Sequence, residues 1–302
     1  MSHVSNSKDR LTIPELQRRA ASGEKLVMTT AYDAVTARIA DAAGVDMLLV
    51  GDSVGNVCLG FDSTLPVTMA MMTHHLEAVA RVSPRAFLLA DMPYLSCSLG
   101  TEEAIRNAGG FIRSGAQAVK LEGGTGRLPV VRALVDAEIP VMAHLGLTPQ
   151  ALHRMGGYKV QGRAGKDAVD LLETALEMQD AGCFAVLLEG IPADLAARVT
   201  EELEVPTIGI GAGPGCSGQV LVFHDLLGLN ADLPPKFVRT YLNAFEQMRT
   251  ALEAWGADVR SGNFPSAQES YALPQEARDW LDRWRGEGDA AEAGLPFLTG
   301  RS

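Results

Sequence analysis

The sequence has little of what disulfide-rich, membrane or nucleic-acid-binding proteins need. Its 4 cysteines are widely spaced and form no C-x-x-C pair, so we expect reduced thiols and neither a disulfide framework nor a zinc site. No stretch reaches the ~18 uninterrupted apolar residues of a membrane span, and the first residues lack the apolar core of a signal peptide. The formal net charge of -11 argues against a phosphate-backbone partner. These absences predict a cytoplasmic protein without nucleic-acid or membrane partners.

Apolar residues, in contrast, are plentiful and occur in short recurring runs. They make up 47% of the 302 residues, and seven runs each end in polar or glycine-rich residues. Runs of this length, rich in Val, Leu and Ile, are typical of strands buried on both faces, as in a parallel sheet covered by helices. The runs are 27–30, 48–53, 88–91, 119–122, 141–144, 186–189 and 208–211, and an eighth strand is expected at 219–223.

Segments with helical periodicity separate these runs. Asp33 is placed to cap the first of them, and Gly44 to end it. The predicted helices are 33–43, 69–82, 101–114, 126–137, 166–181, 193–203 and 235–255. Eight strands alternating with helices predict a (β/α)8, or TIM, barrel, and an open doubly wound sheet is the alternative.

The expected domain organisation is one catalytic barrel with short ends. Residues 11–264 form the barrel, 1–10 a flexible N-terminus, and 265–302 a C-terminal extension. A helix is expected at 274–285, where Trp280 and Trp284 lie one turn apart and pack on the barrel or on a neighbouring subunit. The acidic, glycine- and alanine-rich residues 286–302 are expected to be mobile.

Three carboxylates follow successive predicted strands. Asp52, Asp91 and Glu122 end the second, third and fourth runs. Because parallel strands of a barrel end at the same face, these carboxylates are expected to converge. Unpaired carboxylates in a low-dielectric pocket repel one another, and a hard divalent cation such as Mg2+ removes that conflict. The alternative is that each aspartate only caps the helix that follows it.

Three more ionisable residues stand at strand ends. Lys120 shares a strand face with Glu122 and is placed to stabilise a developing oxyanion, although a structural ion pair is the alternative. His144 precedes a turn, where it can contact a substrate carboxylate or keto oxygen or be only structural. Glu189 follows an apolar run that partly desolvates it, which suits a general base; a cap for the helix after Pro192 is the alternative.

A glycine-rich string invites a nucleotide-binding interpretation that its position contradicts. Residues 213–218 satisfy G-x-G-x-x-G. A pyrophosphate site requires that motif to open a helix after a strand, whereas here it precedes a predicted strand. We therefore expect a tight turn or a close approach of backbone to ligand instead.

Seven strings of the chain, between about residues 10 and 272, resemble ketopantoate hydroxymethyltransferase in kind and order. They are Gly51-Asp-Ser53, Asp91-Met-Pro-Tyr94, Val119-Lys-Leu-Glu-Gly-Gly124, Ala143-His-Leu-Gly-Leu-Thr-Pro149, Tyr158-Lys-Val-Gln-Gly-Arg163, Leu188-Glu-Gly190 and Ile208-Gly-Ile-Gly-Ala-Gly213. The resemblance implies a (β/α)8 barrel that uses Mg2+ and 5,10-methylenetetrahydrofolate. Its reaction hydroxymethylates 3-methyl-2-oxobutanoate to 2-dehydropantoate in pantothenate biosynthesis.

The resemblance also implies roles for individual residues. Asp52 and Asp91 match magnesium ligands at the substrate, and Glu122 matches the carboxylate beside the metal. The matched contacts to the oxo acid are Ser53, Lys120 and His144. Glu189 matches the base, which removes a proton from C3 of the oxo acid so that the enolate attacks the one-carbon unit of the folate. Members that resemble this chain assemble as decamers, so a homodecamer is expected.

Two strings depart from the family pattern. Ser217-Gly-Gln219 stands where the family commonly has Asp-Gly-Gln, and Gln268-Glu-Ser-Tyr271 replaces a Glu-His-Ser-aromatic string. The folate-contacting residues are therefore not assigned from the sequence.

Two other functions compete with this interpretation. The first is a magnesium-dependent carbon-carbon lyase of the isocitrate lyase or phosphoenolpyruvate mutase type, which would need a catalytic cysteine on a mobile loop. None of the four cysteines has suitable sequence surroundings. The second is a barrel that binds oxo acids or folate without turnover.

Overall fold

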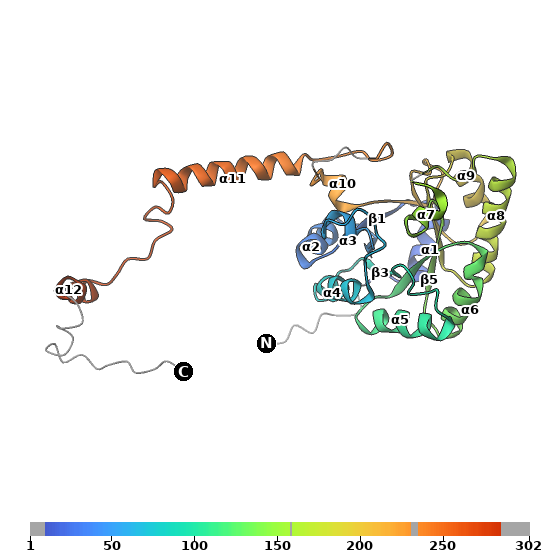
Figure 1. Cartoon of the computed structure of the whole chain (residues 1–302), viewed down its shortest axis with the longest axis horizontal. Coiled ribbons are helices and arrows are strands. Elements are labelled where there is room, and N and C mark those ends of the chain that lie inside the picture. Colours follow the sequence, from blue (N-terminus) through green and yellow to red (C-terminus); the bar gives the residue numbers. More distant parts are fainter. Residues whose placement is uncertain (1–9, 158, 231–234, 285–302) are drawn as a thin grey trace. The chain divides into compact units, whose positions relative to one another are not determined.

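A computed structural model describes residues 10–157, 159–230 and 235–284 (Figure 1). The predicted mobile tail at 286–302 lies outside these ranges, as does all of the predicted flexible N-terminus except Arg10. The described part divides into two compact units, one ending at Phe245 and the other beginning at Glu246. The barrel boundary predicted at residue 264 falls inside the second unit.

The first unit is built on a closed barrel of parallel strands, as the sequence predicts. Each strand pairs with the next in sequence, and β1 also pairs with β8, which closes the sheet and excludes the open alternative. The strands are β1 Leu26–Thr30, β2 Met47–Val50, β3 Phe87–Asp91, β4 Ala118–Glu122, β5 Val141–Gly146, β6 Ala185–Glu189, β7 Thr207–Ile210 and β8 Gly218–Leu221. The eighth strand ends before the predicted 223 because the Phe223 N–H already turns to donate to Thr30 Oγ1, 2.9 Å away.

A helix follows each strand except β7, which leads directly into β8, and these helices pack around the outside of the barrel (Figure 1). Their bounds are α1 Ile13–Ala21, α2 Ala34–Ala42, α3 Val54–Val57, α4 Met69–Ala80, α5 Thr101–Arg113, α6 Leu128–Asp136, α7 Leu152–Met155, α8 Gly165–Asp180, α9 Ala193–Glu202 and α10 Phe223–Leu227. The predicted cap of α2 is confirmed: Asp33 Oδ1 accepts the backbone N–H groups of Val35 and Thr36, both at 2.8 Å. Such a cap is worth about 1 kcal/mol.

Strands β2 to β7 bury both faces, whereas β1 and β8 each expose their second residue, and alternate residues belong to different apolar layers. Met47 and Leu49 of β2 pack inside the barrel, whereas Leu48 and Val50 pack against the helices outside. The interior layer is joined by Leu16 of α1. Towards the carboxyl ends of β3 to β6, the apolar interior positions give way to ionisable ones. This change of chemistry along the barrel axis positions the candidate site.

The predicted helix at 235–255 is wrong at its start. The observed helix is α11 Ala244–Ser261, and residues 235–243 form turns and irregular structure. Backbone hydrogen bonds explain why the helix begins later in the chain than predicted. The N–H of Tyr241 donates to the carbonyl of Leu226, and the N–H of Phe245 donates to that of Gly228. These bonds hold the segment beside the end of α10 and outside a helical path.

The second unit contains most of α11 and a short helix, α12 Gln275–Arg283, close to the predicted 274–285. Trp280 lies within α12, where the guanidinium of Arg283 stacks 4.8 Å from its ring centroid, and Trp284 follows the helix. Both tryptophans are exposed, so their packing against the barrel or another subunit stays a prediction. None of the helices in the described ranges has the length and apolar character needed to cross a membrane.

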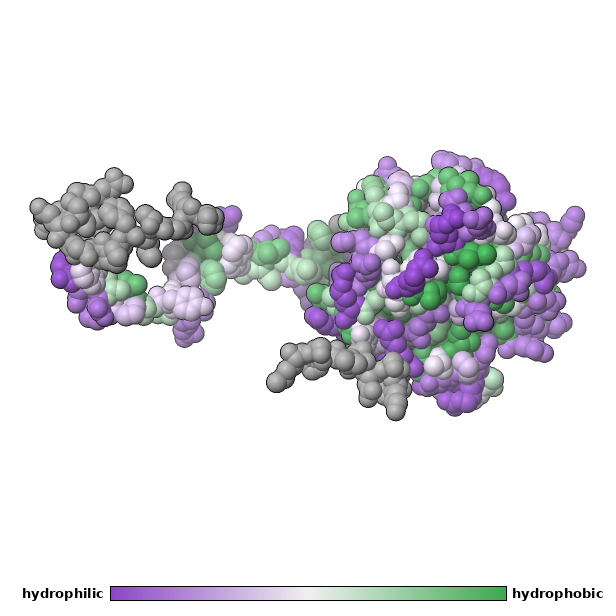
Figure 2. Space-filling model, turned by 90° about the horizontal axis from the view of Figure 1, so that it is seen from below, coloured by the Kyte–Doolittle hydropathy of each residue, from purple (hydrophilic) through white to green (hydrophobic). Residues whose placement is uncertain are grey.

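The two units differ in how many large apolar side chains they expose together. Figure 2 shows hydrophilic residues over the visible face of the first unit, with smaller hydrophobic areas between them. On α11, large apolar side chains recur at helical spacing and are exposed: Phe245, Met248, Leu252, Trp255 and Val259.

Candidate active site

The ionisable residues singled out in the sequence come together at the carboxyl ends of β2 to β6. Asp52 lies in the turn after β2, Asp91 ends β3, Lys120 and Glu122 lie on β4, and His144 lies on β5. These five side chains are buried. Glu189 ends β6, and its side chain is 15% exposed. The barrel thus places a layer of charged groups directly above its apolar interior.

All seven predicted site residues line one cavity of about 160 Å³. Ser53 takes part in this wall, and its Oγ lies 2.8 Å from Tyr32 Oη, which orients the hydroxyl. Leu49, Leu187 and Ile210 form apolar parts of the lining. The cavity is smaller than the ~300–1,000 Å³ of drug-sized ligand sites, so it suits a small, partly apolar molecule.

The three predicted carboxylates meet within this cavity. Asp52, Asp91 and Glu122 each offer an oxygen within 4.8 Å of the others. Asp91 Oδ1 is buried and has no hydrogen-bond partner among the described residues. Burial and the nearby charges of Asp91 and Glu122 raise the pKa of Asp52 well above its ordinary value. A donor set of buried carboxylate oxygens with one orphaned oxygen fits a hard divalent cation such as Mg2+.

Lys120 supplies a positive charge beside the carboxylates. Its Nζ lies 2.9 Å from Asp91 Oδ2 and 3.5 Å from Glu122 Oε1. Burial alone would lower the pKa of Lys120, but the carboxylates of Asp91, Glu122 and Asp52 outweigh burial and raise it. Despite burial, Lys120 and His144 hold the pKa of Glu122 at about 2. One ammonium group thus faces three carboxyl groups, an arrangement that a divalent cation would help to balance.

His144 connects this group to Glu189. Its Nδ1 lies 3.1 Å from Lys120 Nζ and 3.4 Å from Glu122 Oε1, while its Nε2 lies 3.2 Å from Glu189 Oε2. Burial and Lys120 lower the pKa of His144, whereas Glu122 and Glu189 raise it by a larger amount. His144 Nε2 therefore faces the Glu189 carboxylate at ion-pair distance, although it forms no hydrogen bond with a described residue.

Gln150 is a site residue that the sequence interpretation missed. It lies in the short helix η3, Pro149–Ala151, after β5. Its Nε2 donates to Asp52 Oδ2 at 2.8 Å and to the carbonyl of Met92 at 2.9 Å, while its backbone N–H donates to Glu122 Oε2 at 3.0 Å. Gln150 thus holds two of the three carboxylates. Its position could have indicated a role, because Gln150 directly follows Thr148-Pro149 in the loop after β5, at the end of the barrel where the other site residues lie.

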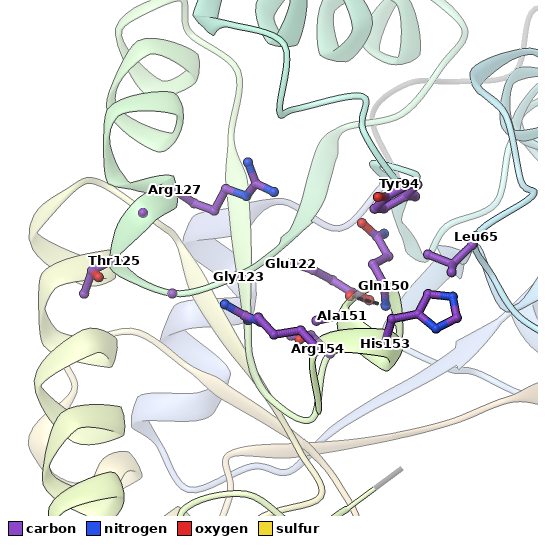
Figure 3. A pocket seen from close by; sticks show the side chains of 13 residues that line it. Leu65, Tyr94, Glu122, Gly123, Thr125, Arg127, Gln150, Ala151, His153 and Arg154 are labelled. Atoms are coloured by element: carbon purple, nitrogen blue, oxygen red, sulfur yellow. Dashed lines mark hydrogen bonds between the residues drawn. The ribbon is translucent and has the colours of Figure 1, made fainter. Parts of the chain in front are cut away.

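A second, larger cavity adjoins the first. It measures about 610 Å³ and shares Glu122 with the small cavity. Figure 3 shows Arg127 and Arg154 on one side, Tyr94, Leu65 and His153 on the other, and Glu122 with Gln150 between them. The sequence interpretation assigned no role to these arginines.

The cysteines do not provide the thiolate that a lyase of the competing type would need. Cys97, Cys183 and Cys216 are buried, and Cys58 is exposed. Burial raises the pKa of Cys97 to about 11 and that of Cys183 to about 12, while the partial desolvation of the Cys58 thiol, with the nearby charge of Asp33, raises its pKa to about 11. These thiols therefore stay protonated near neutral pH, where only the thiolate is a good nucleophile.

Comparison with known proteins decides the family. The model of the ketopantoate hydroxymethyltransferase family matches residues 10–267. This chain belongs to that family. The family membership inferred from the seven strings is therefore confirmed.

Relatives in the ketopantoate hydroxymethyltransferase family cover nearly the whole chain. One is 3-methyl-2-oxobutanoate hydroxymethyltransferase 2 of Bradyrhizobium diazoefficiens, 62% identical over 94% of this chain and 97% of the relative. Another is the 3-methyl-2-oxobutanoate hydroxymethyltransferase of a Methylobacterium species, 61% identical over 90% of this chain and 94% of the relative.

Solved structures similar to this ketopantoate hydroxymethyltransferase family member share its fold. Phosphoenolpyruvate phosphomutase from Streptomyces platensis has a TM-score of 0.58 at 15% identity, covering 90% of this chain and 95% of that one. The 2,3-dimethylmalate lyase of the PEP mutase/isocitrate lyase superfamily has a TM-score of 0.55 at 19% identity, covering 93% and 99%. At such low identity the likeness establishes the barrel fold alone.

Proposed function

We propose that this chain transfers a hydroxymethyl group from 5,10-methylenetetrahydrofolate to 3-methyl-2-oxobutanoate, giving 2-dehydropantoate in pantothenate biosynthesis. The family and the names of the relatives support the transfer reaction and the oxo acid. The observation that carries the proposal is the small cavity in which a buried carboxylate trio lies beside Lys120, His144 and Glu189. Its size and apolar patches suit a short branched oxo acid.

The carboxylate trio is proposed to hold Mg2+. Asp52 and Asp91 would be ligands, and Glu122 would lie beside the metal, with its charge shared with Lys120. Bound Mg2+ would act as a Lewis acid on the oxo acid and make the proton on its C3 more acidic. The orphaned Asp91 Oδ1 supports this assignment, because a buried oxygen without a partner is costly unless a cation occupies the site.

Glu189 is proposed to remove the C3 proton. Its carboxylate is the most accessible of the site's acidic groups, and His144 Nε2 lies 3.2 Å from it. As the C3–H bond breaks, negative charge develops on the substrate oxygen, and the Lys120 ammonium stabilises that charge. Ser53 and His144 would hold the carboxylate and keto groups in place.

The remaining chemistry joins C3 to the one-carbon unit of the folate. The enolate attacks that unit after ring opening to an iminium ion, a carbon-carbon bond forms, and water supplies the hydroxyl as tetrahydrofolate leaves. The bond between N5 and the one-carbon unit breaks, and tetrahydrofolate leaves with N–H groups at N5 and N10. One of these protons is the one that Glu189 took from C3, and the other comes from the water that supplies the hydroxyl. The role of the protein in this half of the reaction is to hold the two reactants together.

The homodecamer and the cytoplasmic location remain part of the proposal. Self-association is supported by α11, on which Met248, Leu252 and Trp255 are each more than half exposed. Apolar side chains at helical spacing favour packing against another protein surface, but they do not set the number of subunits.

The test is formation of 2-dehydropantoate by purified protein with and without Mg2+, alongside Glu189→Gln. We expect product only with the metal, and a kcat about 10²–10⁴-fold lower in Glu189→Gln, the range for loss of a general base. Exchange of the C3 proton with deuterated water, measured without folate, should fall in the same variant. Glu173→Gln, at an exposed position of α8 outside both cavities, is the matched control.

Other outcomes would select the competing functions. Binding of the oxo acid without product or exchange, at saturating Mg2+ and folate, would favour a non-catalytic binder. Cleavage of a carbon-carbon bond in a hydroxylated diacid, without any need for folate, would favour a lyase.

A further inference from the structure

The larger cavity has a size and position that the small substrate does not explain. Its ~610 Å³ fall within the range that holds an extended organic ligand. It meets the small cavity at Glu122, whose partner Gln150 also lines it. A ligand in the larger cavity would therefore have one part beside the reacting atoms and the rest over the loops after β4 and β5.

One side of this cavity is built to present positive charge. After Glu122 the chain turns at Gly123, where φ is +128° and a Cβ would lie 2.8 Å from Arg127 Cγ. Glycine therefore allows the short helix η2, Thr125–Arg127, to bring Arg127 over the cavity. The guanidinium of Arg127 is anchored by the carbonyl of Cys97 at 3.2 Å and by Ser98 Oγ at 2.9 Å.

Arg154 adds a second, uncommitted positive charge. It lies on α7, which ends at Gly156 in the left-handed conformation, and it is exposed. Across the described residues, its guanidinium forms no hydrogen bond or ion pair. Figure 3 shows this group and that of Arg127 facing the same part of the cavity. Two guanidinium groups, one of them without a partner, suit a carboxylate-bearing ligand.

The opposite side of the cavity is suited to a flat ring. Tyr94 is 45% exposed there, and Leu65 and His153 line the same side of the cavity (Figure 3). An exposed aromatic face beside an apolar side chain favours stacking with a heteroaromatic ring. Glu122 and Gln150, which separate this side from the arginines, form the border with the metal-binding carboxylates.

We infer that this cavity binds the one-carbon donor, with the carboxylates of its glutamate tail at Arg127 and Arg154 and its ring system on the Tyr94 side. The inference rests on the proposed function, because it takes the donor to be a reduced folate. It goes further in assigning the tail to two arginines on the loops after β4 and β5. Arg154 is then a residue for donor affinity, with no part in proton removal.

Arg154→Ala tests the inference, with Arg38→Ala as the matched control. Arg38 is an exposed arginine on α2, outside both cavities. In Arg154→Ala we expect the KM for methylenetetrahydrofolate and the Kd for tetrahydrofolate to rise about fivefold, the usual size for an exposed charge pair. The value of kcat, the KM for the oxo acid and the folate-free C3 deuterium exchange should stay within about twofold, and Arg38→Ala should match the parent.

A truncated donor makes the test specific for the tail. Tetrahydropteroate, which lacks the glutamate, should bind the parent and Arg154→Ala equally well, and more weakly than tetrahydrofolate binds the parent. Equal tetrahydrofolate affinity in parent and variant, or an equal loss for both donors in the variant, would overturn the inference. Absence of product from the parent with any donor would instead count against the proposed function, whereas direct binding of tetrahydrofolate reports on the cavity in either case.

Discussion

The two neighbouring cavities differ most in the burial of their charged groups. In the small cavity, Lys120 and Asp91 are 2.9 Å apart and their side chains are at most 4% exposed. In the large cavity, Arg154 is exposed. Charge interactions are worth several times more in a buried site than at a surface, because water and salt do not screen them. The buried charges of the small cavity therefore suit chemistry, and the exposed charge of the large one suits binding.

Burial also makes the small cavity costly to maintain. Its carboxylates repel one another, and the pKa values of Asp52 and Asp91 are raised by burial even though Lys120 acts to lower both. The exposed pairs on the outer helices carry no such penalty. For example, Arg106 and Glu102 lie 2.7 Å apart with side chains 66% and 89% exposed. Two ion pairs with similar distances between their charged atoms can therefore differ widely in interaction energy.

Among the substitutions that test this difference in burial, Lys120→Met is expected to have the largest effect on stability. Removal of the one ammonium group among three buried carboxylates should lower the free energy of unfolding by about 3–5 kcal/mol, since breaking a buried pair leaves a charge uncompensated. Excess Mg2+ should recover part of this loss by taking over the neutralisation. Urea unfolding with and without the metal measures both effects.

The control for Lys120→Met is Lys166→Met, at an exposed position in the first turn of α8. It should change the free energy of unfolding by no more than ~0.5 kcal/mol, as is usual for surface substitutions. Equal losses in the two variants would show that the buried charge balance does not stabilise the fold.

Gln150→Ala is expected to have an intermediate effect, on metal affinity. Loss of the hydrogen bond to Asp52 frees a carboxylate of the trio, and loss of such supporting contacts costs roughly 10- to 100-fold in metal affinity. Calorimetric titration of Mg2+ without substrates measures the change. Gln275→Ala, on exposed α12, should bind Mg2+ as the parent does. An unchanged Kd in Gln150→Ala would show that Asp52 is held by other contacts.

Arg106→Ala should have the smallest effect and would sharpen the comparison with Lys120. Its pair with Glu102 joins positions i and i+4 of α5 at the surface, where such pairs contribute about 0.3–0.5 kcal/mol. Chemical denaturation at low and high salt should show a small loss that disappears as salt rises. A loss comparable to that of Lys120→Met would contradict the importance assigned to burial.

The sequence alone predicted the architecture and most of the site, because both follow from the regular spacing of apolar residues along strands and helices. Short apolar runs separated by helical segments favoured a parallel barrel over an open sheet, and the structure closes it from β1 to β8. Alternation along β4 put Lys120 and Glu122 on one face, and both line the small cavity. Because parallel strands end at one face, residues far apart in the chain were predicted to be neighbours.

Tertiary structure alone decided the contacts made by loops. Gln150 reaches Asp52 across 98 residues of sequence, and Arg127 and Arg154, from two different loops, line the same cavity. Likewise, the start of α11 was set by backbone bonds to the end of α10 and not by propensity. Strands and helices repeat a fixed geometry that a sequence pattern reveals, whereas the path of a loop depends on partners that only the folded chain brings near.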